Sequence, residues 1–252
     1  MGQSQETQDT KQSIMSHFVA LRKVLFVSAG TLLVAFFVIF SAAIKPLMAI
    51  IEQPIVERGI AVIFSAPSEM ITTQMKVSLI AAIVVTSPVI IWQVWRFIRP
   101  ALYDHERKTF WAVFVVTVFL FLLGVAFCYF AVYTLALDFF ITAAEGLATP
   151  MLSIDKYVGF LFGFVVPFGV AFELPVALYI TTRMGLTNYR MLASKRKYII
   201  LAVAIIAAIL TPPDIVSQVM LGIPILILFE ISLLIVRTVK PKADEAETDK
   251  TT

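Results

Sequence analysis

Charged residues, glycine, histidine and cysteine are all scarce in this chain of 252 residues. Only 15% of the residues are charged, against about 25% in an average soluble domain, while 60% are hydrophobic. So few charged side chains cannot cover the surface of a water-soluble globule of 28.0 kDa. Apolar content this high also excludes a disordered coil. The composition therefore indicates an integral membrane protein.

The rare side chains limit the chemistry that the chain can carry. A single cysteine, Cys128, excludes an internal disulfide framework and a cysteine-rich metal cluster. Two histidines, His17 and His105, leave little for a zinc or haem site. The sequence has no HExxH motif, no GxSxG nucleophile elbow and no phosphate-binding glycine loop. We therefore expect neither an enzyme nor a cofactor or metal. The net charge of +3 says nothing by itself about nucleic acid, and we expect no nucleic-acid partner.

Long apolar runs, by contrast, account for most of the sequence. A bilayer core of about 30 Å needs about 20 apolar residues in a helix. The last apolar run, between Lys197 and Arg237, is interrupted by Pro212-Pro213, and a helix cannot continue through these prolines. We predict an all-α membrane protein with one six-helix domain over residues 1–237 and a disordered cytoplasmic tail over residues 238–252. The predicted spans are 24–44, 77–95, 110–137, 157–182, 198–210 and 215–236, with the fifth and sixth helices short.

The distribution of basic residues supports this number of spans. Six spans place both termini on one side of the membrane, together with the loops 96–108 and 183–197. These four segments contain 16 of the 20 lysines and arginines. Cytoplasmic segments are enriched in lysine and arginine. We therefore expect both termini to be cytoplasmic.

The predicted external segment, residues 45–75, contains several prolines and has no long apolar run. We expect it to form a structured cap over the helices. Ser68 can serve as the N-cap of the helix that leads into the second span. Lys76, at the outer edge of that span, is expected to be an anchor at the membrane interface.

Two acidic residues lie inside the last apolar segments. An acid near the middle of a span, such as Glu173, costs about 2.5–3.5 kcal/mol on insertion scales and usually faces a cavity or a partner. Glu173 is therefore either a protonated group bonded to a neighbouring helix, or a polar site for a partner helix or a proton. Glu230 can pair with nearby basic residues. Thr211 and Gln218 add polar groups with which a partner helix could form hydrogen bonds.

The loop after the second span, residues 95–108, reads WRFIRPALYDHERK. It alternates aromatic and charged residues. Glu106 offers a carboxylate that a guanidinium group could engage through two hydrogen bonds, a geometry that lysine matches less well. The alternative is a basic belt at the membrane surface in which Glu106 neutralises Arg107 or Lys108. The composition of the loop favours neither.

Several motifs together make the sequence resemble the TatC family, the membrane receptor of the twin-arginine protein translocation system. The resemblance covers residues 16–237. It is carried by His17-Phe18-Val19-Ala20-Leu21-Arg22-Lys23, Ser65-Ala66-Pro67-Ser68-Glu69, the run 92–107, Phe172-Glu173-Leu174-Pro175 and Leu210-Thr211-Pro212-Pro213-Asp214.

The resemblance implies a fold and a set of binding residues. Members have six helices in a concave, glove-like bundle and lie in the bacterial cytoplasmic (inner) membrane. They bind the paired arginines of signal peptides on folded cargo, self-associate, and assemble with TatA/TatB-type subunits for export driven by the proton gradient. The positions that match the family's signal-peptide site are Glu106, Arg22, Phe97, Leu102 and Tyr103. Those that match its partner-helix site are Glu173, Thr211 and Gln218.

Two positions depart from the family pattern. Ala20 stands where an acid usually precedes Leu-Arg, so an arginine of the signal would rely on Glu106, on Asp104, or on Glu6 or Asp9. Ala208 replaces a larger, polarisable residue near Thr211, so partner docking can differ in detail. The alternative function is a proton-coupled secondary transporter of a small solute that uses Glu173. The absence of internal repeats in the sequence disfavours it.

Overall fold

The structure, a computed structural model, describes residues 2–102, 107–145, 151–211 and 214–239. Helices account for most of these residues, and one pair of three-residue strands joins distant parts of the chain. The elements in chain order are α1 (Gly2–Val38), the π-helix η1 (Ile39–Ala43), α2 (Ile44–Val56), β1 (Ala61–Ile63), α3 (Pro67–Leu102), α4 (Arg107–Phe127), the π-helix η2 (Cys128–Tyr133), α5 (Thr134–Ala144), β2 (Met151–Ser153), α6 (Ile154–Ala171), α7 (Leu174–Arg183), α8 (Tyr189–Ser194), α9 (Arg196–Leu210) and α10 (Ile215–Thr238).

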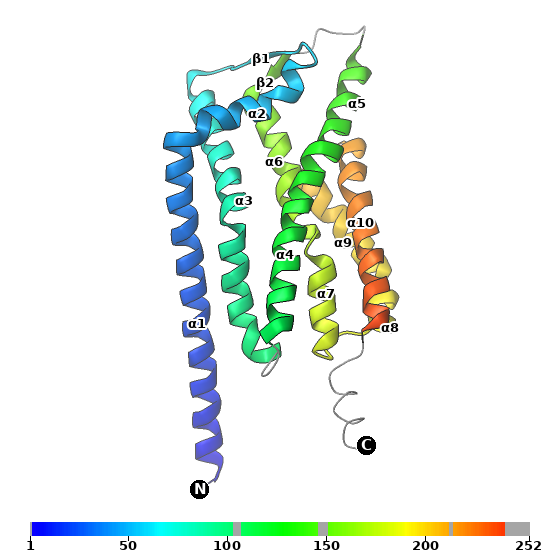
Figure 1. Cartoon of the computed structure of the whole chain (residues 1–252). Helices are drawn as coiled ribbons and strands as arrows, with labels where there is room; N and C mark the ends of the chain where they lie inside the picture. The colour runs from blue at the N-terminus through cyan, green and yellow to red at the C-terminus, as the bar shows by residue number, and fades with distance from the viewer. Residues whose placement is uncertain (1, 103–106, 146–150, 212–213, 240–252) are drawn as a thin grey trace.

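The long helices run up and down along one common direction (Figure 1). α2 turns across the upper end, where β1 and β2 also lie, while α8 lies at the lower end. α10 ends at the same lower end at which α1 begins. The bend after α1 coincides with η1 and with Pro46, which has no N–H to donate to the preceding turn.

Five helical segments of the described chain are long and apolar enough to cross a membrane: Val19–Val56, Pro67–Phe97, Trp111–Ala144, Ile154–Arg183 and Ile215–Thr238. This confirms a helical membrane protein. α9 has 15 residues, or about 23 Å at 1.5 Å per residue, which is less than the about 30 Å of a bilayer core. The prediction of a short sixth helix is wrong, because α10 has 24 residues and Asp214 caps its start by accepting a bond from the Ser217 N–H at 2.7 Å.

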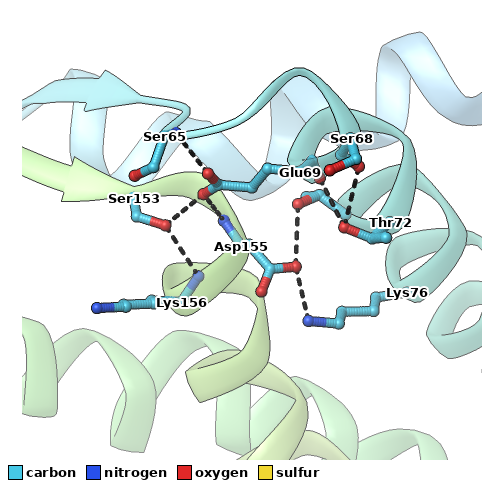
Figure 2. A network of polar contacts seen from close by, with 9 residues as sticks. Ser65, Ser68, Glu69, Thr72, Lys76, Ser153, Asp155 and Lys156 are labelled. Carbon is cyan, nitrogen blue, oxygen red and sulfur yellow. Dashed lines mark hydrogen bonds and ion pairs between the residues drawn. The ribbon is translucent and has the colours of Figure 1, made fainter.

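A polar network holds the upper end of the bundle together (Figure 2). β1 and β2 pair in parallel, with Ala61 opposite Met151 and Ile63 opposite Ser153. Glu69, in the first turn of α3, accepts hydrogen bonds from the Ser153 hydroxyl, from the Ser65 N–H and, at 3.3 Å, from the Asp155 N–H. Residues more than 80 positions apart are thereby joined.

The same network corrects the expected start of α3. The helix begins at Pro67, so Ser68 lies inside its first turn, and the Glu69 carboxylate instead accepts from the N–H groups ahead of the helix. A proline suits this first position because its missing N–H would have no partner there. Lys76, which the sequence predicts to be an interfacial anchor, also pairs its ammonium group with Asp155 at 2.6 Å.

α6 forms the centre of the bundle. Phe164 and Phe168 on this helix are completely buried, as is Tyr133 of η2. Two glycines allow neighbouring helices to approach closely. A Cβ on Gly124 of α4 would lie 2.8 Å from the Phe168 carbonyl oxygen, and one on Gly163 would lie 2.6 Å from that of Leu210 at the end of α9.

Candidate functional site

Glu173 lies at a break in the fourth long segment. α6 ends at Ala171 and α7 begins at Leu174, because Pro175 has no N–H with which to continue the helical hydrogen bonds. The Glu173 residue is half-buried, and its Oε1 atom is fully buried without a hydrogen-bond partner among the described residues. An unpaired carboxylate oxygen inside an apolar bundle is costly, so it is a candidate site for an external hydrogen-bond donor or for a proton.

Aromatic packing holds this break in place. The ring of Phe127 on α4 lies 5.6 Å from that of Phe172 and 5.9 Å from that of Phe168, measured between ring centroids. Gly124, one turn earlier on α4, brings its backbone against Phe172 and the Phe168 carbonyl. The position of Glu173 is therefore set by packing between α4 and α6.

A second polar region lies where α9 turns into α10. Thr211 is buried, and its hydroxyl donates to the Ala207 carbonyl at 2.9 Å. Gln218 is half-buried in the first turns of α10. Beside it, the Ser217 hydroxyl is buried without a hydrogen-bond partner in the described chain. Sequence reasoning missed Ser217, although its place beside Gln218 near the start of an apolar helix is the signal that could have found it.

The structure does not bring Glu173 and Thr211 together. Leu210, next to Thr211, packs against Gly163. Gly163 precedes Glu173 by ten residues, which is about 15 Å along a helix axis. The two regions are therefore separate polar points at different depths of the bundle, and a partner that contacts both has to run along the helices.

The residues expected to bind a signal peptide lie only partly within the described chain. Arg22 is exposed on α1, and Phe97 is half-buried near the end of α3. Leu102 is the last residue of α3. Tyr103 and Glu106 fall outside the described residues. The described end of α3 and the start of α4 both lie at the lower end of the bundle (Figure 1).

Two further ion pairs join elements that are distant in the sequence. Arg196 at the start of α9 binds both carboxylate oxygens of Glu230 on α10, at 2.8 and 2.9 Å. Glu230 therefore pairs with a basic residue, as the sequence allows. Arg58 pairs with Asp138 at 2.7 Å, and this hydrogen bond raises the pKa of the Arg58 guanidinium. Sequence reasoning missed the second pair, because a single cation and acid 80 residues apart carry no local signal.

In the described part of the chain no group of histidines, cysteines and acids could hold a metal ion. Its polar groups lie at a helix break, at a turn between helices and at the bundle ends. The fold and these sites together define a multi-pass helical membrane protein whose polar groups are placed for binding.

Comparison with known proteins gives the family. Residues 16–224 match the family model of the Sec-independent protein translocase protein (TatC). The chain is 34% identical over 241 residues to TatC of Carboxydothermus hydrogenoformans, covering 95% of this chain and 99% of that protein. It is 37% identical over 238 residues to TatC of Aquifex aeolicus, covering 93% and 98%.

A solved structure agrees with these sequence matches. The chain superposes with a TM-score of 0.82 and 38% identity on the crystal structure of a twin-arginine translocase receptor, TatC, covering 88% of this chain and 98% of that one. The protein belongs to the TatC family: it is the TatC receptor subunit of a Sec-independent translocase, a transport protein and not an enzyme.

Proposed function

We propose that this protein binds the twin-arginine signal peptides of folded proteins at the segment that joins α3 and α4, with Glu106 as the group that holds an arginine. The positions of the helices on either side of this segment support the proposal. α3 ends and α4 begins at the lower end of the bundle, where α1, the helix that bears Arg22, also begins (Figure 1). Phe97 near the end of α3 supplies an aromatic surface at the same end.

The chemistry of the pair favours arginine over lysine. A carboxylate accepts two parallel N–H bonds from a planar guanidinium, a geometry that an ammonium group cannot reproduce. Because Ala20 replaces the family's acid on α1, this chain would hold one of the two arginines with fewer carboxylates. We therefore assign the larger part of the preference for arginine over lysine to Glu106. Leu102 and Tyr103 contact the apolar part of the peptide.

The membrane topology that accompanies this function has six spans in a concave, glove-like bundle, with both termini in the cytoplasm of a bacterium. The single domain extends over residues 1–237, and residues 238–252 form a cytoplasmic tail. In this arrangement α9 is the short fifth span. α1 begins and α10 ends at the same end of the bundle (Figure 1), which supports the even number of crossings.

Assembly with TatA/TatB-type subunits is proposed at the two polar regions inside the bundle. The unpartnered Oε1 of Glu173 can accept a hydrogen bond from a polar residue on a single-span partner. Thr211 and Gln218, near the α9–α10 turn, offer further polar groups along the same bundle. Self-association of the receptor and export driven by the transmembrane proton gradient complete the proposal.

Cross-linking to a signal peptide tests the receptor function. Glu106→Gln removes the charge and one of the two strong acceptors, so the yield of cross-links between this loop and a twin-arginine peptide should fall at least tenfold, the factor that about 1.4 kcal/mol represents. A peptide with two lysines should cross-link poorly to the unaltered protein.

The control is Glu145→Gln, which removes an exposed carboxylate after α5, at the other end of the bundle. This variant should cross-link like the unaltered protein. Undiminished cross-linking of Glu106→Gln would contradict the proposed role of this residue.

A further inference from the structure

An apolar pocket lies between α6, α7, α9 and α10, on the same side of the bundle as the short helix α9. Its volume is about 490 Å³, and every residue that lines it is apolar. It extends from Gly163 and Leu210 at one end to Leu192 and Ile199 at the other. Glu173 is not among its lining residues. We call it the α9 pocket.

The dimensions of the α9 pocket indicate what can occupy it. Ile199 and Leu210 are eleven residues apart on α9, or about 16 Å along the axis. The pocket's volume of about 490 Å³ falls within the roughly 300–1,000 Å³ of sites that bind small molecules. An apolar pocket of this length and volume suits an extended hydrocarbon chain.

The chain around Leu192 and Ile199, two residues that line one end of the pocket, is basic. The segment 183–197 carries five lysines and arginines and no acid. Arg196 is already paired with Glu230, but Arg190, Lys195 and Lys197 are exposed. Lys195 and Lys197 place their Nζ atoms 5.3 and 5.2 Å from the centre of the Tyr198 ring. Tyrosine and lysine side by side at a helix end are typical of the membrane interface.

We propose that the α9 pocket is a binding site for a glycerophospholipid with an anionic head group. One acyl chain fills the pocket, and the phosphate and head group lie against Lys195, Lys197 and Arg190. The acyl chain explains the purely apolar lining, and the anionic head group matches the exposed Arg190, Lys195 and Lys197 at that end. A zwitterionic lipid would satisfy the first feature but not the second. Lipid held here would cover the gap between α6 and the short helix α9.

Retention of defined lipids by the purified full chain tests this proposal. The detergent-washed protein is mixed with palmitoyl-oleoyl phosphatidylglycerol or with the phosphatidylcholine of the same chains, and bound lipids are counted by native mass spectrometry. The unaltered protein should retain phosphatidylglycerol in preference to phosphatidylcholine. Lys195→Gln and Lys197→Gln should each weaken this preference roughly fivefold, the contribution of one cation near an anionic lipid surface. Lys23→Gln and Lys45→Gln, which neutralise exposed lysines elsewhere, should leave it unchanged.

A matched pair of substitutions on α9 tests the acyl-chain site. Ala202 lines the pocket, whereas Ala204 does not. Both residues are exposed on the same helix. Ala202→Phe should abolish retained phospholipid, and Ala204→Phe should preserve it. Both positions are exposed, so neither ring disturbs the packed interior.

Three results would overturn the proposal. The first is equal retention of the two lipids by the unaltered protein, and the second is equal retention by Ala202→Phe and Ala204→Phe. The third is that a photo-reactive residue at position 202, in membranes, links to a protein subunit instead of to lipid. These measurements involve no signal peptide, so a negative result would not bear on the proposed receptor function. In the same way, a negative result in the signal-peptide experiment would not bear on the lipid site.

Discussion

The carboxylate of Glu173, in the middle of an apolar bundle, is energetically costly and therefore requires an explanation. Glu173 lies at the break between α6 and α7, with Oε1 buried and unpartnered within the described chain. Loss of hydrogen bonding for a buried polar atom costs about 1–3 kcal/mol. Evolution could remove this cost with an apolar residue, so the group is better explained by an external partner than by a contribution to stability.

Two substitutions at Glu173 separate its possible roles. Glu173→Ala removes the charge and the hydrogen-bonding atoms, so cross-links between TatA/TatB-type helices and the fourth span should shift or fall, while signal-peptide cross-links persist. Glu173→Gln keeps hydrogen bonding without an ionisable proton. If the residue serves only as a hydrogen-bonding group for a partner, Gln should preserve partner contacts and transport.

Transport lost in Glu173→Gln with partner contacts intact would instead assign a proton to this position. Partner cross-links and transport unaltered in Glu173→Ala would contradict both roles and leave a structural one. Glu145→Gln, an exposed carboxylate outside the bundle interior, is the control for loss of charge alone.

At the scale of elements, the close approach of helices depends on particular glycines of α6. Gly163 and Gly159 are one turn apart on this helix, yet their surroundings differ. A Cβ at position 163 would lie 2.6 Å from the Leu210 carbonyl oxygen, whereas a Cβ at position 159 would meet nothing within 4 Å. The contact at Gly163 is what lets the short helix α9 end against the middle of α6.

This difference predicts opposite effects of the same substitution. Gly163→Ala should destabilise the protein by roughly 1–3 kcal/mol, because the methyl group forces α9 away from α6. Gly159→Ala should be neutral or stabilise it by up to about 1 kcal/mol, because alanine loses less backbone entropy in a helix. Unfolding in mixed micelles with increasing SDS measures both. Equal effects of the two substitutions would show that α9 does not pack against α6 as the structure has it.

The upper end of the bundle shows how elements distant in sequence are fastened. Glu69 of α3 accepts bonds from Ser153 and from the Asp155 N–H, and Asp155 also pairs with Lys76. These contacts hold the first turns of α3 and α6 beside the β1–β2 pair (Figure 2). The cap is therefore a polar clamp between two membrane-spanning helices, and α2 lies across the same end.

At the scale of the whole molecule, opposite ends of the bundle should face opposite compartments. Phe64 lies between β1 and α3 at the upper end, and Leu186 lies between α7 and α8 at the lower end. Both side chains are exposed, and the native thiol of Cys128 is completely buried. Single cysteines at these two positions can therefore be labelled without labelling of the native Cys128.

The proposed orientation predicts which cysteine reacts first. In spheroplasts, a membrane-impermeant maleimide should label Phe64→Cys at once and Leu186→Cys only after the membrane is disrupted. The reverse order would place the termini outside the cytoplasm. Three long segments separate the two positions, which is an odd number of crossings. Labelling of both positions in intact spheroplasts would contradict that odd number.

The sequence was most informative where the relevant physics is local. Membrane insertion depends on hydropathy summed over about 20 residues, so the long segments could be predicted from the runs themselves. The break between α9 and α10 follows from Pro212-Pro213, because proline cannot continue a helix. The sixth helix is predicted to be short, although its apolar run is visible in the sequence and α10 has 24 residues. The start of α3 was misplaced by two residues, because an N-cap at Ser68 would make Glu69 the first helical residue, whereas α3 begins at Pro67.

What the sequence alone determined is the class of protein: too few charges for water, apolar runs for helices, and basic residues gathered on the segments of one side. Only the tertiary structure decided that Glu173 and Thr211 are separate sites, that Lys76 pairs with Asp155, and that α9 borders an apolar pocket. The physical reason is that these features depend on how helices pack. The contact between Lys76 and Asp155, which are 79 residues apart, is set by the packing of α3 against α6, and no local pattern encodes it.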